Sequence, residues 1–321
     1  MRPKILMWMS AIALPAALCV YIATTALPAH GTFPGTNGQI TYGRFNSTIG
    51  DFQIFVANPD GSHEVQLTTV PSEVSDWSPD GSRIAFDFFD GQTVQIATIK
   101  PGQTGFTQLT FQENVFHGEP AWSPDGTKIA IDSDAGNHPA GEGIYIIDAS
   151  TGTVLSRITA NPFGWFDEQP RWSPDGQQIA FTRVKQVLRR SEVMAVFLVR
   201  ADGTGLRQLT QWGLNAAYPD WSPDGQTISF QTYAAHSGPS SIFTIHPDGS
   251  GLTALVRTTG DASFFQARWS PDGTKLIFAG SPDFRKTGNA LWTVDANGSN
   301  LTQTAISGAL SFPAWGTHPL Q

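Results

Sequence analysis

The sequence predicts an all-β protein, a six-bladed β-propeller built from four-stranded antiparallel blades. Two observations carry this prediction. The pentapeptide WSPDG occurs five times at intervals of 45, 50, 49 and 48 residues, and short apolar runs separated by turn residues fill each interval. A period of this length, with four strands per unit, is typical of a propeller blade. The five copies begin at Trp77, Trp122, Trp172, Trp221 and Trp269.

Each SPDG segment has the composition of a tight turn, in which Pro brings a fixed φ and Gly accepts a positive one. A short apolar strand follows, such as RIAF from Arg83. A second apolar run with its own turn comes next, as in IFVANPDGS from Ile54, and a short strand such as RQLT from Arg207 ends most units. These brief runs between Gly and Pro residues leave no room for helices.

The sixth blade is predicted to come from both ends of the chain. Trp315 follows Trp269 by 46 residues, with only a few residues after it, while GQITYG from Gly38 matches the second strand of a unit that lacks its Trp strand. Pairing these two segments completes one blade and removes two open sheet edges. The alternative is an open stack of repeats in which both strands stay unpaired.

Residues 1–29 are predicted to lie outside the propeller, which would occupy residues 30–321. Arg2 and Lys4 precede an uncharged stretch from Ile5 to Leu27, a pattern typical of an export signal. The stretch is also long enough to span a membrane, so an uncleaved anchor remains the alternative. Both interpretations predict an exported propeller, periplasmic or extracellular, with residues 5–27 as a membrane tether in the second case.

The composition excludes several classes of function. With 40% hydrophobic and 14% charged residues, 32 Gly and 22 Pro, the chain is typical of a folded strand-and-turn protein. Cys19 is the only cysteine, so the exported part has no disulfide, cysteine nucleophile or thiolate metal site. Without residues 1–29 the chain carries 17 basic and 27 acidic residues, and we therefore expect no nucleic-acid partner.

The repeat resembles that of a known family. WSPDG followed by xIAF, then IYxxD…G and LT, is similar to the WD-repeat-like units of TolB-type six-bladed propellers, over roughly residues 36–316. TolB carries a separate α/β domain ahead of its propeller, whereas this sequence resembles the propeller alone. The same units occur in prolyl oligopeptidase-like peptidases, but no G-x-S-x-G elbow is present here. Similarity of fold does not transfer either activity.

The two faces of the predicted propeller differ in the regularity of their loops. One face carries the SPDG turns and the turns between third and fourth strands, which are uniform. The other carries the loops between second and third strands and the links between blades, which vary in length and composition. Variable loops on a rigid scaffold are typical of binding surfaces. We therefore predict that the binding site lies on this variable face.

Aromatic residues are frequent in the variable loops, and Trp and Tyr are common in binding hot spots. If the innermost strands line a channel, the residues three positions before each motif tryptophan form a ring in it: Val74, Glu119, Gln169, Tyr218, Gln266 and Phe312. The predicted binding residues are Glu119, Trp165, Phe166, Glu168, Trp212, Tyr218, Phe265 and Gln266. The motif tryptophans recur in every blade and are assigned to packing. Some of the loop aromatics would instead fill gaps between blades, and the ring could line no more than a water-filled channel.

Two long loops offer weaker candidates. Asp132, Asp134, Asn137 and Glu142 have oxygen ligands at calcium-like intervals but lack the Gly and final Glu of a calcium loop, so we predict no metal there. The run RVKQVLRRSE from Arg183 is basic in an otherwise acidic chain. It would either dock an acidic partner or form a solvated loop.

These observations favour an exported, non-enzymatic, monomeric propeller that binds a protein or peptide partner of the cell envelope. One alternative is a small-molecule hydrolase or lyase with a channel metal, for which Glu119 and Glu168 are few ligands. The other is a carbohydrate or cell-wall binder that uses Trp165 and Trp212 as stacking platforms. We assign no catalytic residue, no metal and no cofactor from the sequence.

Overall fold

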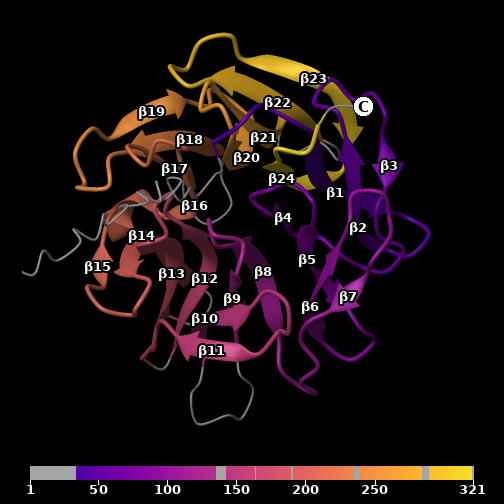
Figure 1. Ribbon diagram of the computed structural model, residues 1–321. Coiled ribbons are helices and arrows are strands. Elements are labelled where there is room, and N and C mark those ends of the chain that lie inside the picture. Colours follow the sequence, from indigo (N-terminus) through magenta and orange to yellow (C-terminus); the bar gives the residue numbers. More distant parts are fainter. Residues whose placement is uncertain are drawn as a thin grey trace, which may run out of the picture.

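The computed structural model describes residues 34–134, 142–162, 164–188, 191–233, 239–283 and 289–319. They form six four-stranded antiparallel sheets arranged around a central axis, so the predicted six-bladed propeller is confirmed (Figure 1). Its one helical element among these residues is a 3-10 turn, η1 (Trp212–Leu214). No helix in the described part is long and apolar enough to cross a membrane. The predicted signal or anchor, residues 1–29, lies outside the described residues.

The blades are named A to F, and their strands are given from the axis outward. Blade A holds β24 (Leu310–Trp315), β1 (Ile40–Asn46), β2 (Asp51–Ala57) and β3 (Val65–Gln66). Blade B holds β4 (Ser75–Trp77), β5 (Ile84–Phe89), β6 (Val94–Ile99) and β7 (Thr107–Gln108). Blade C holds β8 (His117–Trp122), β9 (Lys128–Ser133), β10 (Gly143–Asp148) and β11 (Val154–Arg157).

The second half of the ring follows the same order. Blade D holds β12 (Trp165–Trp172), β13 (Gln178–Leu188), β14 (Ser191–Arg200) and β15 (Arg207–Gln208). Blade E holds β16 (Ala216–Trp221), β17 (Ile228–Tyr233), β18 (Ser240–Ile245) and β19 (Thr253–Val256). Blade F holds β20 (Ser263–Trp269), β21 (Lys275–Ser281), β22 (Asn289–Asp295) and β23 (Thr302–Gly308).

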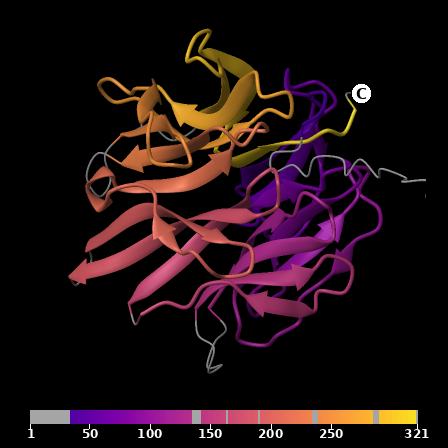
Figure 2. The ribbon, with the colours of Figure 1, turned by 60° about the vertical axis from the view of Figure 1, so that its left-hand side comes forward.

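Blade A is composed of strands from both ends of the chain, as predicted. β24 pairs antiparallel with β1, with Ile40 opposite Trp315. The pairing continues past the strand ends, because Gly38 N donates to Gly316 O at 2.9 Å and the Trp315 indole Nε1 donates to Gly38 O at 3.1 Å. Figures 1 and 2 show the yellow C-terminal strand beside the indigo N-terminal strands. The ring therefore closes without an open edge between first and last blade.

The hydrophobic core is divided into layers between neighbouring blades. Trp122 of blade C packs with Ala85, Ile96 and Leu109 of blade B. Trp172 of blade D packs in the same way against Ile144 and Ile146 of blade C. All six motif tryptophans are at most 9% exposed. Each indole thus joins two sheets, which is why a tryptophan recurs at this position.

The SPDG turns also connect neighbouring blades. In blade C, the Ser123 hydroxyl donates to Asp125 Oδ1 at 2.6 Å and accepts from Lys128 N at 2.9 Å, which closes the turn. Gly126 has a φ of +68°, and a Cβ placed there would touch Pro79 of blade B at 3.5 Å. Glycine is therefore required for the backbone conformation, while proline supplies the contact with the next blade.

The basic run from Arg183 differs from the predicted loop. It belongs to β13 and β14, the two longest strands. They pair from Gln178 opposite Arg200 to Leu188 opposite Ser191. Arg183 itself is 5% exposed, and its Nε lies 2.6 Å from Asp167 Oδ1. A solvated loop is thus the wrong interpretation, and the Arg183 guanidinium is already neutralised within the blade. Arg189 and Arg190 lie outside the described residues.

Closure by β24 gives a first testable prediction. Deletion of residues 310–321 should remove the inner strand of blade A together with the buried side chains of Leu310, Ala314 and Trp315. We expect a loss of at least about 5 kcal/mol in unfolding free energy, from the lost burial and the exposed β1 edge. Urea denaturation followed by circular dichroism measures it, with deletion of residues 320–321 as the control. An unchanged midpoint for the longer deletion would contradict ring closure by this strand.

Candidate binding site at the channel mouth

The inner strands carry a bulge at the position predicted to line the channel. Each bulged residue stands three positions before a motif tryptophan and has a positive φ: Glu119 (49°), Gln169 (59°), Tyr218 (56°), Gln266 (60°) and Phe312 (43°). The ladder with the second strand shifts register there, for example between Gly118 and Ala121 in blade C. This conformation costs a non-glycine residue on the order of 1–3 kcal/mol. It also releases the N–H of the residue from the ladder.

The released N–H groups bind side chains of the preceding blade. Gln169 N donates to Glu119 Oε2 at 2.6 Å, and Tyr218 N donates to Gln169 Oε1 at 3.1 Å. Phe312 N donates to Gln266 Oε1 at 2.8 Å, and Gln266 N donates to Gln231 Oε1 at 2.7 Å. We call this series of bonds the bulge relay. It joins blades C, D, E, F and A in turn around the axis.

Blade B begins the relay through Asp87. Its Oδ1 accepts from Val74 N at 2.9 Å, and the carboxylate also accepts from the backbone N–H of Glu119 in blade C. Asp87 stands ten residues after Trp77, and the corresponding positions in blades D and E are Thr182 and Gln231, which also accept relay bonds. The second strands therefore add acceptors to the relay, in blades B and E where the inner ring supplies none and in blade D beside Gln169.

The channel is closed towards the SPDG face. The residues just before the motif tryptophans meet there, and four of them carry charge: Asp76, Arg171, Asp220 and Arg268. Asp220 Oδ2 accepts from Trp269 N at 2.8 Å, while its Oδ1 lies 3.4 Å from the Arg268 guanidinium. Only about 30 Å³ of space remains between these side chains and the indoles. A ligand can therefore reach the described channel only from the variable face.

At the variable face the channel opens into a mouth of about 390 Å³. No lysine or arginine is among the described residues that line it. Six carboxylates do so: Asp51, Glu73, Asp87, Glu119, Asp132 and Glu168. The rings of Tyr218 and Phe312 lie in the same mouth, with their centroids 5.6 Å apart. The site is therefore an acidic well with an aromatic wall.

Burial makes ionisation of this cluster unfavourable. It raises the pKa of Glu168 to about 7, and the charges of Glu192 and Asp167 add to the effect. Burial likewise raises the pKa of Asp87 to about 6, although backbone N–H groups stabilise its charge. For Glu119 and Asp132, burial and then the neighbouring carboxylates raise each pKa well above its usual value. A positive group from outside would relieve this repulsion.

One acceptor in the mouth has no partner. Asp132 is 8% exposed, and its Oδ1 forms no hydrogen bond with the described residues. A Cβ at position 118 would meet the Phe116 ring at 2.5 Å and this oxygen at 3.1 Å, so the missing side chain at Gly118 leaves room for the Phe116 ring beside Asp132. A buried acceptor without a donor costs free energy, which suggests a donor from outside the described chain.

The structure brings together only some of the residues predicted from the sequence. Glu119, Glu168 and Tyr218 line the mouth, and Gln266 supports it through the bulge relay. Trp165 and Trp212 are half-buried and pack edge to face at 5.7 Å, and Trp212 also packs against Phe197 of the core. Phe265 packs against the blade A–F core layer, and Phe166 is half-buried on β12. A binding role for these four residues stays a prediction.

An exposed apolar surface lies beside the mouth, and it was not predicted from the sequence as one surface. Large apolar residues exposed on the variable face occur in consecutive loops of blades A and B, and we call them the apolar crescent: Phe45, Ile49, Val70, Phe89 and Phe111, each 38–67% exposed. Phe45 and Phe89 hold the same repeat position, where blades C, E and F have Asp134, Tyr233 and Ser281. A blade-by-blade comparison of that position is the signal that could have found them.

The buried carboxylate Asp87 was also missed, and Asp132 was considered only as part of a calcium-like loop. Both follow an apolar run at the tenth position after a motif tryptophan, where the repeat changes from Asp to Thr, Gln and Ala. A comparison of this tenth position between blades could have identified both residues from the sequence. Asp132 of the calcium-like series lines the channel mouth, and residues 135–141 of that loop lie outside the described residues.

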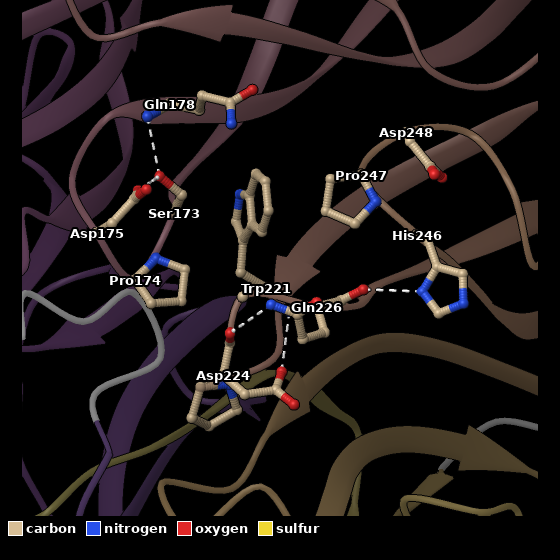
Figure 3. A pocket seen from close by; sticks show the side chains of 12 residues that line it. Ser173, Pro174, Asp175, Gln178, Trp221, Asp224, Gln226, His246, Pro247 and Asp248 are labelled. Carbon is tan, nitrogen blue, oxygen red and sulfur yellow. Dashed lines mark hydrogen bonds between the residues drawn. The ribbon is translucent and has the colours of Figure 1, made fainter.

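The largest cavity lies on the opposite face and reflects the repeat. It measures about 830 Å³ between the SPDG turns of blades D and E, over Trp221. Figure 3 shows its polar groups bonded to one another, with Ser173 joined to Asp175 and Gln178 within one turn, and His246 of the next turn joined to Gln226. Similar grooves of about 420 and 560 Å³ lie between blades C and D and between E and F. Repetition indicates that these grooves result from the architecture.

Six four-stranded blades closed around an acidic well define the protein as a β-propeller with its candidate site on the axis. The chain belongs to the family of TolB beta propeller domains, whose family model matches residues 30–319. No curated protein sequence matches the chain.

Solved structures support the same fold. The chain is similar to TolB from Acinetobacter baumannii, with a TM-score of 0.67 and 20% identity over 87% of this chain and 66% of that one. It is similar to a TolB protein from Agrobacterium tumefaciens, with a TM-score of 0.61 and 21% identity over 86% and 92%. The chain is also similar to an oligogalacturonate lyase in complex with manganese, with a TM-score of 0.55 and 14% identity over 84% of this chain and 74% of that one. At these identities the likeness establishes the fold alone.

The bulge relay predicts a stability effect. Gln266→Leu should leave the Phe312 N–H without its acceptor, which costs about 1–3 kcal/mol in unfolding free energy. Gln177→Leu, at an exposed turn position with no side-chain bond in the described structure, is the matched control and should change stability by less than about 0.5 kcal/mol. Chemical denaturation measures both. Equal effects of the two variants would show that the relay bond contributes nothing.

The raised pKa of Glu168 predicts a pH dependence of stability. The folded state binds this proton up to about pH 7, whereas the ordinary pKa is 4.5, so stability falls as pH rises from about 4.5 to 7. Glu168→Gln removes the charge, and it should raise the unfolding free energy at pH 8 by up to about 3 kcal/mol, at about 1.4 kcal/mol per pKa unit. At pH 4.5 the effect should be small. Exposed Glu113→Gln is the control, and a gain that is equal at both pH values would refute the assignment.

Proposed function

We propose that this propeller is an exported, non-enzymatic binding module that docks a protein or peptide partner of the cell envelope on its variable face. The contact surface consists of the acidic mouth and the apolar crescent. The observation that carries the proposal is the position of the crescent, since five large apolar side chains are exposed in successive loops beside a concave acidic site. Apolar surface next to charged groups is typical of partner-binding sites.

The remaining exposed apolar residues support this interpretation by contrast. They are 40–51% exposed, and all follow the turn between the third and fourth strands of their blades: Val65, Phe106, Val154, Leu155, Leu206, Leu252 and Leu301. They recur from blade to blade and lie away from the mouth, so we assign them to the repeat. The crescent is confined to blades A and B, as expected of a surface that evolved for one partner.

The two alternatives have less support. A hydrolase or lyase with a channel metal needs several ligands that converge, and among the described residues no group of three or more His, Cys, Asp or Glu is arranged to hold one. A carbohydrate binder needs free indole faces. Here Trp165 packs against Trp212, and the Lys185 ammonium lies 5.1 Å from its ring centroid. No observation favours either over partner binding.

The proposal predicts which substitutions abolish partner capture. The tagged full chain should retain a specific partner from an envelope extract of its own cells. Phe89→Ser with Phe111→Ser should reduce capture at least tenfold, because two apolar contacts are lost from the surface. Leu206→Ser with Leu252→Ser removes similarly exposed side chains at repeated positions and should leave capture unchanged. Equal loss with both pairs, or loss with neither, would contradict docking on the crescent.

A further inference from the structure

The mouth is a blind well rather than an open channel. Its floor is the bulge relay, and below that the Asp76–Arg171–Asp220–Arg268 layer leaves about 30 Å³. A group that enters from the variable face meets carboxylates at the bottom and aromatic rings at the side. A well of about 390 Å³ that is closed below has room for one long side chain.

Three carboxylates at the bottom of this well retain acceptor capacity. Asp132 Oδ1 is buried and makes no hydrogen bond with the described residues, and it lies beside Gly118 and the Phe116 ring. Glu119 uses Oε2 to accept from Gln169 N, and its other oxygen makes no hydrogen bond with the described residues. The Glu168 carboxylate likewise makes none within the described chain. Three separate acceptors match the three N–H donors of an ammonium group.

The chain supplies little positive charge of its own to this group of acids. Arg171 lies below the relay, where it stabilises the charges of Asp76 and Glu119. Arg183 is committed to Asp167 through Nε and Nη2, at 2.6 and 2.7 Å. Lys185 lies over the outer ring of Trp165. The excess negative charge in the mouth is therefore left for a ligand to neutralise.

We infer that the mouth is a receptor for one lysine side chain on an extended segment of the partner, with its ammonium held by Glu119, Asp132 and Glu168. This inference rests on the proposed function. The four-carbon stem passes Tyr218 and Phe312, since a lysine covers apolar surface with its methylene groups. The residues beside the lysine lie on the apolar crescent. The raised pKa values of the carboxylates agree with an unfilled cation site.

A lysine is favoured over the other cations. The described carboxylates do not form a group that could hold a metal ion. An ammonium sits on a flexible stem and can rotate its three N–H donors towards acceptors that lie further apart. The guanidinium of arginine is planar and binds best to a single carboxylate in a fork. Such a pair would engage Glu168 alone and leave Glu119 and Asp132 without a donor. The partner is therefore expected to carry lysine flanked by apolar residues.

The test is selection from a random heptapeptide library displayed with both peptide ends embedded in the carrier protein, on the immobilised full chain. We expect recovered sequences to be enriched in lysine next to apolar residues. Selection on Glu119→Gln/Glu168→Gln should lose this enrichment, and selection on the exposed control Glu113→Gln should keep it. Replacement of the lysine in a recovered peptide by norleucine should weaken binding at least tenfold by calorimetry. Thermal unfolding of each variant shows that it is folded.

Several results would contradict the inference. Recovery of no carboxylate-dependent sequence, or a preference for arginine, would overturn the lysine assignment. Binding of Ca²⁺ or Mn²⁺ alone that depends on Glu119 and Glu168 and blocks selection would make the mouth a metal site instead. If the inference fails while Phe89→Ser with Phe111→Ser still abolishes capture of the envelope partner, the proposed function stands. If both tests fail, the docking surface itself is wrong.

Discussion

The bonds between bulged inner-strand N–H groups and the preceding blade are the constraint on which the channel depends. Inner strands of six blades approach one axis, and a regular ladder would leave their side chains at the usual alternating positions. The bulge turns Glu119, Gln169, Tyr218, Gln266 and Phe312 into the left-handed region and releases one N–H each. Every released donor then needs an acceptor from a neighbouring blade, because burying it unpaired would add a further cost to that of the bulge. Blade orientation and channel lining are thus fixed by the same contacts.

The acidic mouth places function and stability in opposition. Glu119, Asp132 and Glu168 are buried near one another, and burial with mutual repulsion raises the pKa of each. Such a cluster destabilises the folded state at neutral pH, since unfolding would return the charges to water. A fold selected only for stability would replace them with the amides found at Gln169, Gln231 and Gln266, which satisfy the same relay. Retention of charge in blades B to D, beside the apolar crescent, is therefore better explained by binding than by packing.

Interaction surfaces in a repeat protein are expected where the repeat is broken. The SPDG face repeats its serine, proline, aspartate and glycine in five blades, and its largest groove recurs beside two neighbouring pairs. The variable face departs from the repeat at positions that the ladder does not constrain, such as those of Phe45 and Phe89. Blades A and B contribute apolar residues there, and blades B to D contribute buried acids. An extended partner that contacts both groups would therefore lie across the variable face from blades A and B towards blades C and D.

The sequence by itself determined the architecture: the period of WSPDG, the turn chemistry and the unmatched Trp315 strand were enough for six blades and their closure, because each is a local pattern repeated many times. It also placed Glu119 and Tyr218 on the axis through their position before the motif tryptophan. Tertiary structure alone decided the rest. Whether Trp165 and Trp212 are free or packed depends on β13 and β14 being long, and whether Asp87 and Asp132 face Glu119 depends on how neighbouring blades meet. Contacts between residues about fifty positions apart are set by packing across the ring, and no single blade contains the information.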